Sequence, residues 1–247
     1  KGTVNRSGAR CICCGANVPF DYIREESRAG RMGARLIAVV ADGNPGRIYL
    51  TVQNDMEKLA RVDKPADYPD GELAYYPGHL NTKVYGLDHF ADLFTNRQLT
   101  TLSTLSELLP EIQQEVYRDV GTDDHDERNL ADGGAGRRAY SEAVCVYLAF
   151  LIDKLTDYNS SICSWNAGRD GLRGTFGRQA IPMVWDFAEG NFFSNSSGCF
   201  DNTMEWIEKA LLNMPAKTVG EVWQQNAAED NGLRGIMVSS DPPYYDN

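Results

Sequence analysis

The chain has 247 residues, of which 42% are apolar, 10% aromatic and 24% charged. These are ordinary globular proportions, and they exclude global disorder. No apolar run approaches the roughly 18 residues needed to span a bilayer, so we expect a cytoplasmic chain with no membrane insertion. The formal net charge of −11 at pH 7 is atypical of a free-standing nucleic-acid binder.

The charge is unevenly distributed along the chain. Residues 1–61 hold ten basic and six acidic side chains, a net charge of +4, whereas the remaining 14 basic and 29 acidic side chains give −15. Two interpretations are open: a local fluctuation on a solvated surface, or a separate N-terminal lobe with its own partner.

A Cys-x-x-Cys-Gly knuckle begins at Cys11 and ends with Cys14 and Gly15. Small turns of this kind direct two thiolates toward one tetrahedral metal ion, and the glycine permits the tight turn. A structural zinc ion needs four ligands, but no second cysteine or histidine pair follows. We therefore expect zinc only if the missing ligands precede Lys1, or if Cys13 substitutes for one of them.

A β-hairpin is predicted after the knuckle. Residues 35–40 and 47–52 alternate or run apolar, and between them lies Asp-Gly-Asn-Pro-Gly, a strong turn signal. A knuckle followed by a hairpin is typical of a zinc ribbon. We therefore predict a basic, zinc-ribbon-like lobe over residues 1–62 and a second region over residues 63–247.

The second region is predicted to be largely helical. Thr95 and Gln98 have the spacing of a capping box, and Pro110 suits the first turn of the next helix. Residues 138–156 are apolar nearly all round, which predicts a buried helix. Residues 235–240 form a short β-prone run. Apolar periodicity and capping patterns predict helices over residues 96–109, 111–119, 138–156 and 201–214, with a further start at Thr218-x-x-Glu221.

Asp241, Pro242, Pro243 and Tyr244 follow the β-prone run directly, where α/β enzymes place reactive groups. Two prolines in series fix φ and remove donors, which makes a rigid elbow with carbonyls free to accept. The carboxylate and a carbonyl can accept both hydrogens of an exocyclic amine, while the tyrosine ring stacks on the base. The alternative is a plain structural turn at the end of a strand.

This motif resembles the catalytic Asp/Asn/Ser-Pro-Pro-Tyr motif of amino-methylating DNA methyltransferases, whose Asp form is typical of adenine N6 methylation. Three further stretches, residues 2–15, 28–34 and 176–191, the last reading FGRQAIPMVWDFAEGN, are similar to one group. That group is the large prokaryotic adenine-specific DNA methylases with an inserted zinc ribbon and an associated domain of unknown function. The resemblance extends over essentially the whole chain.

The resemblance implies S-adenosylmethionine as methyl donor, DNA as partner, and catalytic roles for the four residues of the motif. Such enzymes also carry a Phe-x-Gly-x-Gly turn at the cofactor, upstream of the ribbon, and nothing in this chain matches it. The glycines of residues 133–136 follow an acidic loop and are typical of a linker. No cofactor-binding residue is therefore assigned, and we expect an internal segment of the enzyme that is inactive by itself.

Arg169, Arg173 and Arg178 lie in a glycine-rich stretch, residues 165–179. Arginines, glycines and an amide in a flexible loop can cradle phosphates, so these three are the candidate DNA-binding residues. The alternative is that they pair with some of the 29 acidic residues downstream of residue 61. The sequence favours neither.

These patterns predict the α+β class. The chain would be a fragment of an α/β S-adenosylmethionine-dependent methyltransferase, with a hairpin lobe, a largely helical middle and the strand that carries the catalytic loop. The rival interpretation is a non-enzymatic nucleic-acid or protein-interaction module. In that case the N-terminal lobe recognises the partner, and the Pro-Pro-Tyr end is only a structural turn.

Overall fold

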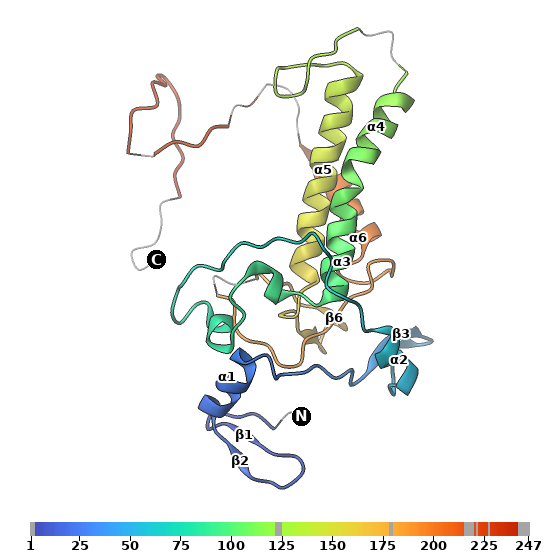
Figure 1. Ribbon diagram of the computed structural model, residues 1–247. Helices are drawn as coiled ribbons and strands as arrows, with labels where there is room; N and C mark the ends of the chain where they lie inside the picture. The colour runs from blue at the N-terminus through green and yellow to red at the C-terminus, as the bar shows by residue number, and fades with distance from the viewer. Residues whose placement is uncertain are drawn as a thin grey trace. The chain divides into compact units, whose positions relative to one another are not determined.

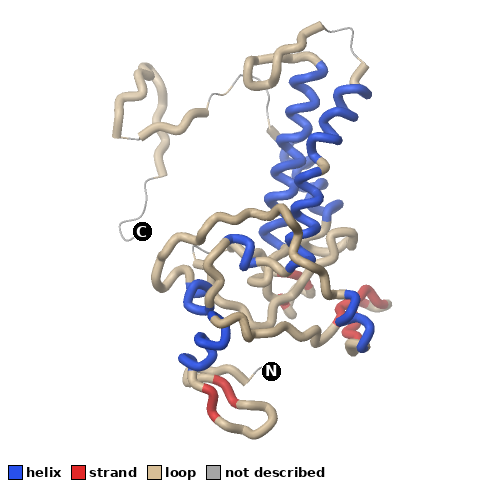
Figure 2. Tube along the Cα trace, in the orientation of Figure 1, coloured by secondary structure: helices blue, strands red, loops and turns tan. Residues whose placement is uncertain are grey.

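The computed structural model describes residues 3–121, 125–177, 180–214, 220, 222–226 and 228–241. These residues combine helices with small antiparallel hairpins, which confirms the α+β class (Figures 1 and 2). The chain divides into two units, Lys1–Leu211 and Leu212–Asn247. The boundary expected at residue 62 lies inside the first unit and stays a prediction.

The elements are named in chain order. They are β1 (Ala9–Arg10), β2 (Asn17–Val18), α1 (Phe20–Arg28), β3 (Val39–Gly43), β4 (Gly46–Leu50), α2 (Asn54–Leu59), the 3-10 helices η1 (Asn81–Tyr85) and η2 (Phe90–Leu93), α3 (Asn96–Glu107), α4 (Leu109–Asp119), α5 (Arg137–Tyr158), β5 (Trp165–Asn166), β6 (Gly171–Leu172) and α6 (Phe200–Asn213).

The predicted hairpin is formed by β3 and β4. Its antiparallel register pairs Val39 with Leu50 and closes with Gly43 opposite Gly46. Gly46 has a φ of +79°, a conformation that favours glycine, so the turn forms where the sequence places it. The first strand begins at Val39, later than expected, because residues 31–38 are irregular and pair with no strand among the described residues.

The predicted capping box starts α3. The Gln98 backbone N–H donates to Thr95 Oγ1 at 3.2 Å, and the Thr95 N–H donates to Gln98 Oε1 at 2.8 Å. Pro110 occupies the first turn of α4, as its missing donor favours. α4 then packs along α5, which runs in the opposite direction beside it (Figure 1).

The main core joins α3, α5 and α6. Its buried members are Leu102, Leu151, Leu155 and Phe192. The partly buried side chains of Met204 and Ile207, both in α6, pack against them. The burial predicted for α5 holds for one face only. Tyr140 and Phe150 are both 55% exposed, whereas Leu151 and Leu155 are buried.

Two predictions made from the sequence concern residues of the unit Leu212–Asn247. The strand predicted over residues 235–240 is wrong, because these residues are irregular and pair with no strand in the described part of the chain. A β-prone run needs a neighbouring strand to satisfy its backbone, and Met237 stays 96% exposed. The helix start expected at Thr218 and Glu221 lies outside the described residues. No described helix is long and apolar enough to cross a membrane.

Candidate nucleic-acid interface

The stretch predicted as a flexible arginine loop contains an ordered hairpin. β5 and β6 pair antiparallel, with Trp165 opposite Leu172 and Asn166 opposite Gly171. The turn closes through hydrogen bonds from the Arg169 N–H to the Asn166 carbonyl (3.1 Å) and from the Gly168 N–H to Asn166 Oδ1 (3.2 Å). Arg169 thus lies in the turn of a short hairpin whose backbone is fixed by local bonds.

Arg173 follows β6, and its N–H donates to the Ser164 carbonyl at 3.0 Å. The side chains of Arg169 and Arg173 are exposed, and neither makes an ion pair or hydrogen bond with any residue that the structure describes. Arg178, the third candidate, lies outside the described residues.

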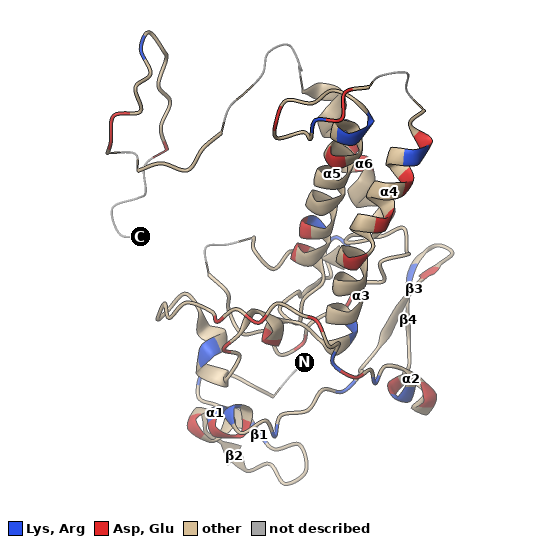
Figure 3. Cartoon of the chain, turned by 45° about the horizontal axis from the view of Figure 1, so that its top comes forward, with Lys and Arg blue, Asp and Glu red and all other residues tan. Residues whose placement is uncertain are grey.

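Their lack of a partner sets these two arginines apart. Downstream of residue 62, every other described arginine has a carboxylate within 4 Å: Arg97, Arg118, Arg128, Arg137, Arg138 and Arg234. Figure 3 shows acidic and basic residues interspersed along the helices. The alternative in which Arg169 and Arg173 pair with downstream acids therefore does not hold among the described residues.

The β3–β4 hairpin, from a distant part of the chain, contacts the hairpin of β5 and β6, which with Arg173 we call the arginine hairpin. Trp165 Nε1 donates to the Tyr49 hydroxyl at 3.1 Å, and the same hydroxyl donates to Asp170 Oδ1 at 3.4 Å. The two aromatic rings also meet edge to face, with centroids 6.4 Å apart. Tyr49 of β4 thus fixes both the start of β5 and the turn residue Asp170, whose φ of +46° is unusual for a residue other than glycine.

Asp157, near the end of α5, fixes the other side of the hairpin. Its backbone carbonyl accepts from the Thr175 N–H at 2.7 Å, and its Oδ1 accepts from the Phe176 N–H at 3.0 Å. A Cβ on Gly174 would lie 2.8 Å from both carboxylate oxygens, so a larger residue there would displace the Asp157 carboxylate. Sequence analysis missed Tyr49, Asp157 and Phe176, because no local pattern links residues so far apart in the chain.

The cysteine knuckle lies at the tip of the β1–β2 hairpin. The Cys11 N–H donates to the Ala16 carbonyl, and the Gly15 N–H donates to the Cys11 carbonyl, both at 2.9 Å. Backbone N–H groups of Cys14 and Cys13, in that order of effect, lower the pKa of the Cys11 thiol because they favour its thiolate. This geometry suits the first ligand of a metal knuckle.

The knuckle does not complete a zinc site from the residues around it. The six cysteines are all free thiols. The described residues contain no group of three or more cysteine, histidine or acidic side chains arranged to hold a metal ion. The assignment of Cys11 and Cys14 as zinc ligands stays a prediction, and Cys13 does not complete a group of three with them among the described residues.

Of the predicted catalytic motif, only Asp241 is described. It is exposed and irregular, in the unit Leu212–Asn247. Pro242, Pro243 and Tyr244 lie outside the described residues, so the geometry of the motif stays a prediction.

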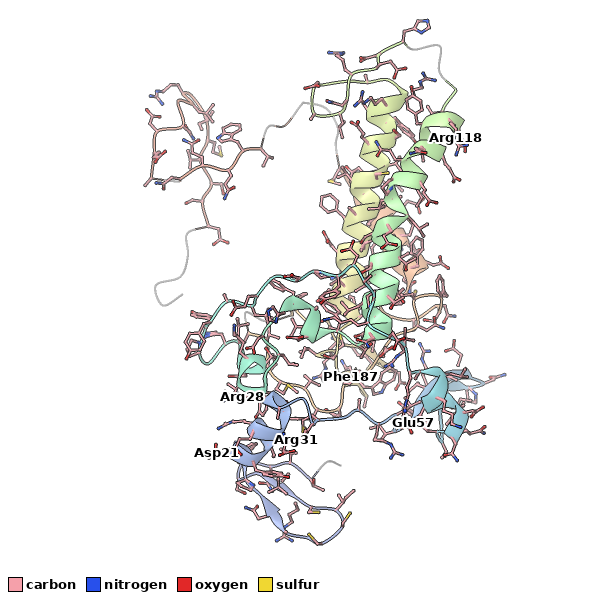
Figure 4. All side chains as sticks on the ribbon, viewed as in Figure 1. Asp21, Arg28, Arg31, Glu57, Arg118 and Phe187 are labelled. Carbon is pink, nitrogen blue, oxygen red and sulfur yellow. The ribbon has the colours of Figure 1, made fainter. Side chains whose placement is uncertain are left out.

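The segment around Phe187, labelled in Figure 4, is a packed part of the fold. The Ala188 N–H donates to the Cys163 carbonyl at 2.8 Å, and Trp185 meets Tyr85 edge to face with centroids 5.0 Å apart. Glu189 holds the Arg97 guanidinium with two hydrogen bonds of 2.8 Å, which raises the pKa of Arg97. Glu189 therefore connects this segment to the start of α3.

Comparison of the chain with models of known protein families, with curated proteins and with solved structures gave no match. The assignment of function therefore depends on the geometry of the arginine hairpin and on the sequence motifs.

Proposed function

We propose that the chain is the DNA-contacting part of an S-adenosylmethionine-dependent adenine-N6 DNA methyltransferase. The observation that carries the proposal is the pair Arg169 and Arg173, which are exposed and have no acidic partner among the described residues, in a region of the chain that is otherwise strongly acidic. An unpaired guanidinium on a fixed backbone is ready to bind a phosphate with two parallel hydrogen bonds.

The charge distribution supports contact with DNA at this hairpin. The region after residue 61 carries a net charge of −15, which repels a polyanion, so within that region a local cluster of uncompensated cations is needed to attract it. Phosphate contacts set the position of a protein on DNA without reading its sequence. Arg169 and Arg173 would therefore position the substrate and leave base recognition to other residues.

In the proposed enzyme, the resemblance assigns the chemical step to the motif that begins at Asp241. The Asp241 carboxylate accepts one hydrogen of the adenine exocyclic amine, the Pro242 carbonyl accepts the other, and Tyr244 stacks on the extruded base. Pro243 keeps the elbow rigid. Bound S-adenosylmethionine supplies an electrophilic methyl group, and the motif contributes chiefly by orienting the amine lone pair for in-line displacement.

One observation favours the rival function, a nucleic-acid-binding module without methyl transfer. The described residues contain only two-stranded antiparallel hairpins, and the run before Asp241 forms no strand. A methyltransferase places its catalytic motif at the end of a strand in a larger sheet. The rival places recognition of a nucleic acid or a protein in the N-terminal lobe, residues 1–62, and differs from the proposed enzyme in having no methyl transfer.

The proposed DNA binding is tested with the 247-residue chain. Its affinity for a fluorescently labelled duplex is measured by fluorescence anisotropy over a series of salt concentrations. The double variant Arg169→Ala/Arg173→Ala should bind about tenfold more weakly at low salt, and its log-log salt slope should fall by about 1.8, the value for two phosphate contacts. The matched control is Arg118→Ala/Arg128→Ala, which removes two exposed arginines that have acidic partners. An equal loss in the control, or no loss in the test variant, would contradict the proposal.

A further inference from the structure

Phe176 presents an apolar ring to solvent on a backbone that cannot easily turn it inward. The side chain is 53% exposed, while its N–H is held by Asp157 Oδ1 at 3.0 Å. The preceding residue, Thr175, is buried and fixed twice: its N–H donates to the Asp157 carbonyl, and its hydroxyl lies 2.7 Å from Ser160 Oγ. These hydrogen bonds hold in place the backbone that carries the ring.

The ring lies close in the chain to the unpaired arginines. Arg173 is three residues before Phe176, and its backbone is held by the Ser164 carbonyl. Three residues span at most about 10 Å between Cα atoms. The fixed segment from Arg173 to Phe176 therefore presents a cation and an aromatic face within the reach of a single short ligand.

From these contacts we propose that Phe176 stacks on an unpaired nucleobase while Arg173 and Arg169 bind neighbouring phosphates. This inference rests on the proposed DNA-binding function and names its substrate class as single-stranded or locally unpaired DNA. A flat ring needs the face of a base, and in a closed duplex each base face is covered by its neighbours. The unpaired arginines select a polyanion over a neutral apolar partner, which decides the occupant of this surface.

The test compares binding of a labelled single-stranded 20-mer with binding of the matching duplex, again with the full 247-residue chain. The native chain should bind the single strand at least threefold more tightly than the duplex. Phe176→Leu keeps an apolar side chain but removes the aromatic face, so single-strand affinity should fall about five- to tenfold, within the range for loss of one stacked base. Phe176→Tyr should retain affinity within twofold, and duplex binding should be unchanged in both variants.

Phe193→Leu is the matched control, because Phe193 is 84% exposed but lies outside the arginine hairpin. It should leave single-strand binding within twofold of the native value. Equal binding of single strand and duplex, or equal effects of Phe176→Leu and Phe193→Leu, would overturn the inference. If Phe176→Leu has no effect while Arg169→Ala/Arg173→Ala still weakens binding, the stacking inference fails and the DNA-binding function stands. If neither variant changes binding, both fail.

Discussion

At the scale of single residues, the proposed function depends on a few side chains that fix backbone segments far from them in the chain. Tyr49 braces the turn that holds Arg169, and Asp157 braces the segment that follows Arg173. The Tyr49 hydroxyl bonds to both Trp165 and Asp170, and Asp157 bonds to the adjacent residues Thr175 and Phe176, so each orders a segment that would otherwise lose conformational freedom in the proposed complex with DNA. Ordered arginines bind phosphate at a lower entropic cost than those of a flexible loop.

In the loop before α5, the Asp126 carboxylate likewise joins two parts of the backbone through hydrogen bonds. It accepts hydrogen bonds from the Arg128 side chain and from the Ala135 N–H, and these bonds, the first largest, hold the pKa of its carboxyl well below the usual range. A carboxyl with a depressed pKa stabilises the folded loop at any pH above about 3.9, the unfolded value. This stabilisation is lost as the pH falls toward the folded pKa.

We predict a low titration midpoint for the Asp126 carboxyl group, which carbon-13 NMR can measure. In the native chain the midpoint should lie well below 3.9, and Arg128→Gln should move it upward toward that value because the variant removes the strongest donor. Ala135 amide protection should decline over the same pH range as the titration. A native midpoint in the ordinary range would show that the loop does not hold the carboxylate as described.

At the scale of secondary-structure elements, local signals predicted local structure well. The capping box at Thr95, the turn at Gly46 and the proline start of α4 depend on neighbours within a few residues, and all three form as predicted. The run over residues 235–240 has strand composition but needs a partner strand, which sequence pattern alone cannot supply. Element type is thus predictable where the hydrogen-bond partners are near in sequence.

The candidate site was predictable only in part, for the same reason. Composition identified Arg169 and Arg173 as candidate DNA contacts, but not whether acidic residues would neutralise them. The hydrogen bonds that order the hairpin join Tyr49 to residues more than 100 positions away and Asp157 to residues almost 20 positions away. Contacts of this kind arise from tertiary packing, which has no short-range signature.

The cap of α3 gives a prediction at this scale. Thr95→Ala removes the acceptor of the Gln98 N–H and a bond to Glu189, so the free energy of unfolding should fall by about 1 kcal/mol. Urea denaturation measures the change. Thr100→Ala is the control, because the Thr100 hydroxyl bonds only to the Asn96 carbonyl within the helix, and the change there should be a few tenths of a kcal/mol at most. Equal effects of the two substitutions would show that the capping box contributes nothing to stability.

At the scale of the whole molecule, the proposed DNA binding has to be reconciled with an acidic net charge of −11. Among the described arginines downstream of residue 62, those on the helices and in the loops are neutralised by carboxylates, whereas Arg169 and Arg173 are not. In the proposed enzyme the knuckle hairpin and the arginine hairpin belong to Lys1–Leu211, and Asp241 belongs to Leu212–Asn247. DNA positioning and methyl transfer would therefore reside in different units of the chain and be separable by mutation.

The measurement that tests the central claim most directly is transfer of tritiated methyl from S-adenosylmethionine to DNA adenine by the full-length gene product. The native protein should form N6-methyladenine. Asp241→Ala should lower the rate about 100-fold or more with DNA binding retained. Asp230→Ala, which removes an exposed carboxylate paired with Arg234 in the same unit, should stay within twofold of the native rate. Absence of methylation by the native protein, or an unchanged rate in Asp241→Ala, would contradict the methyltransferase function.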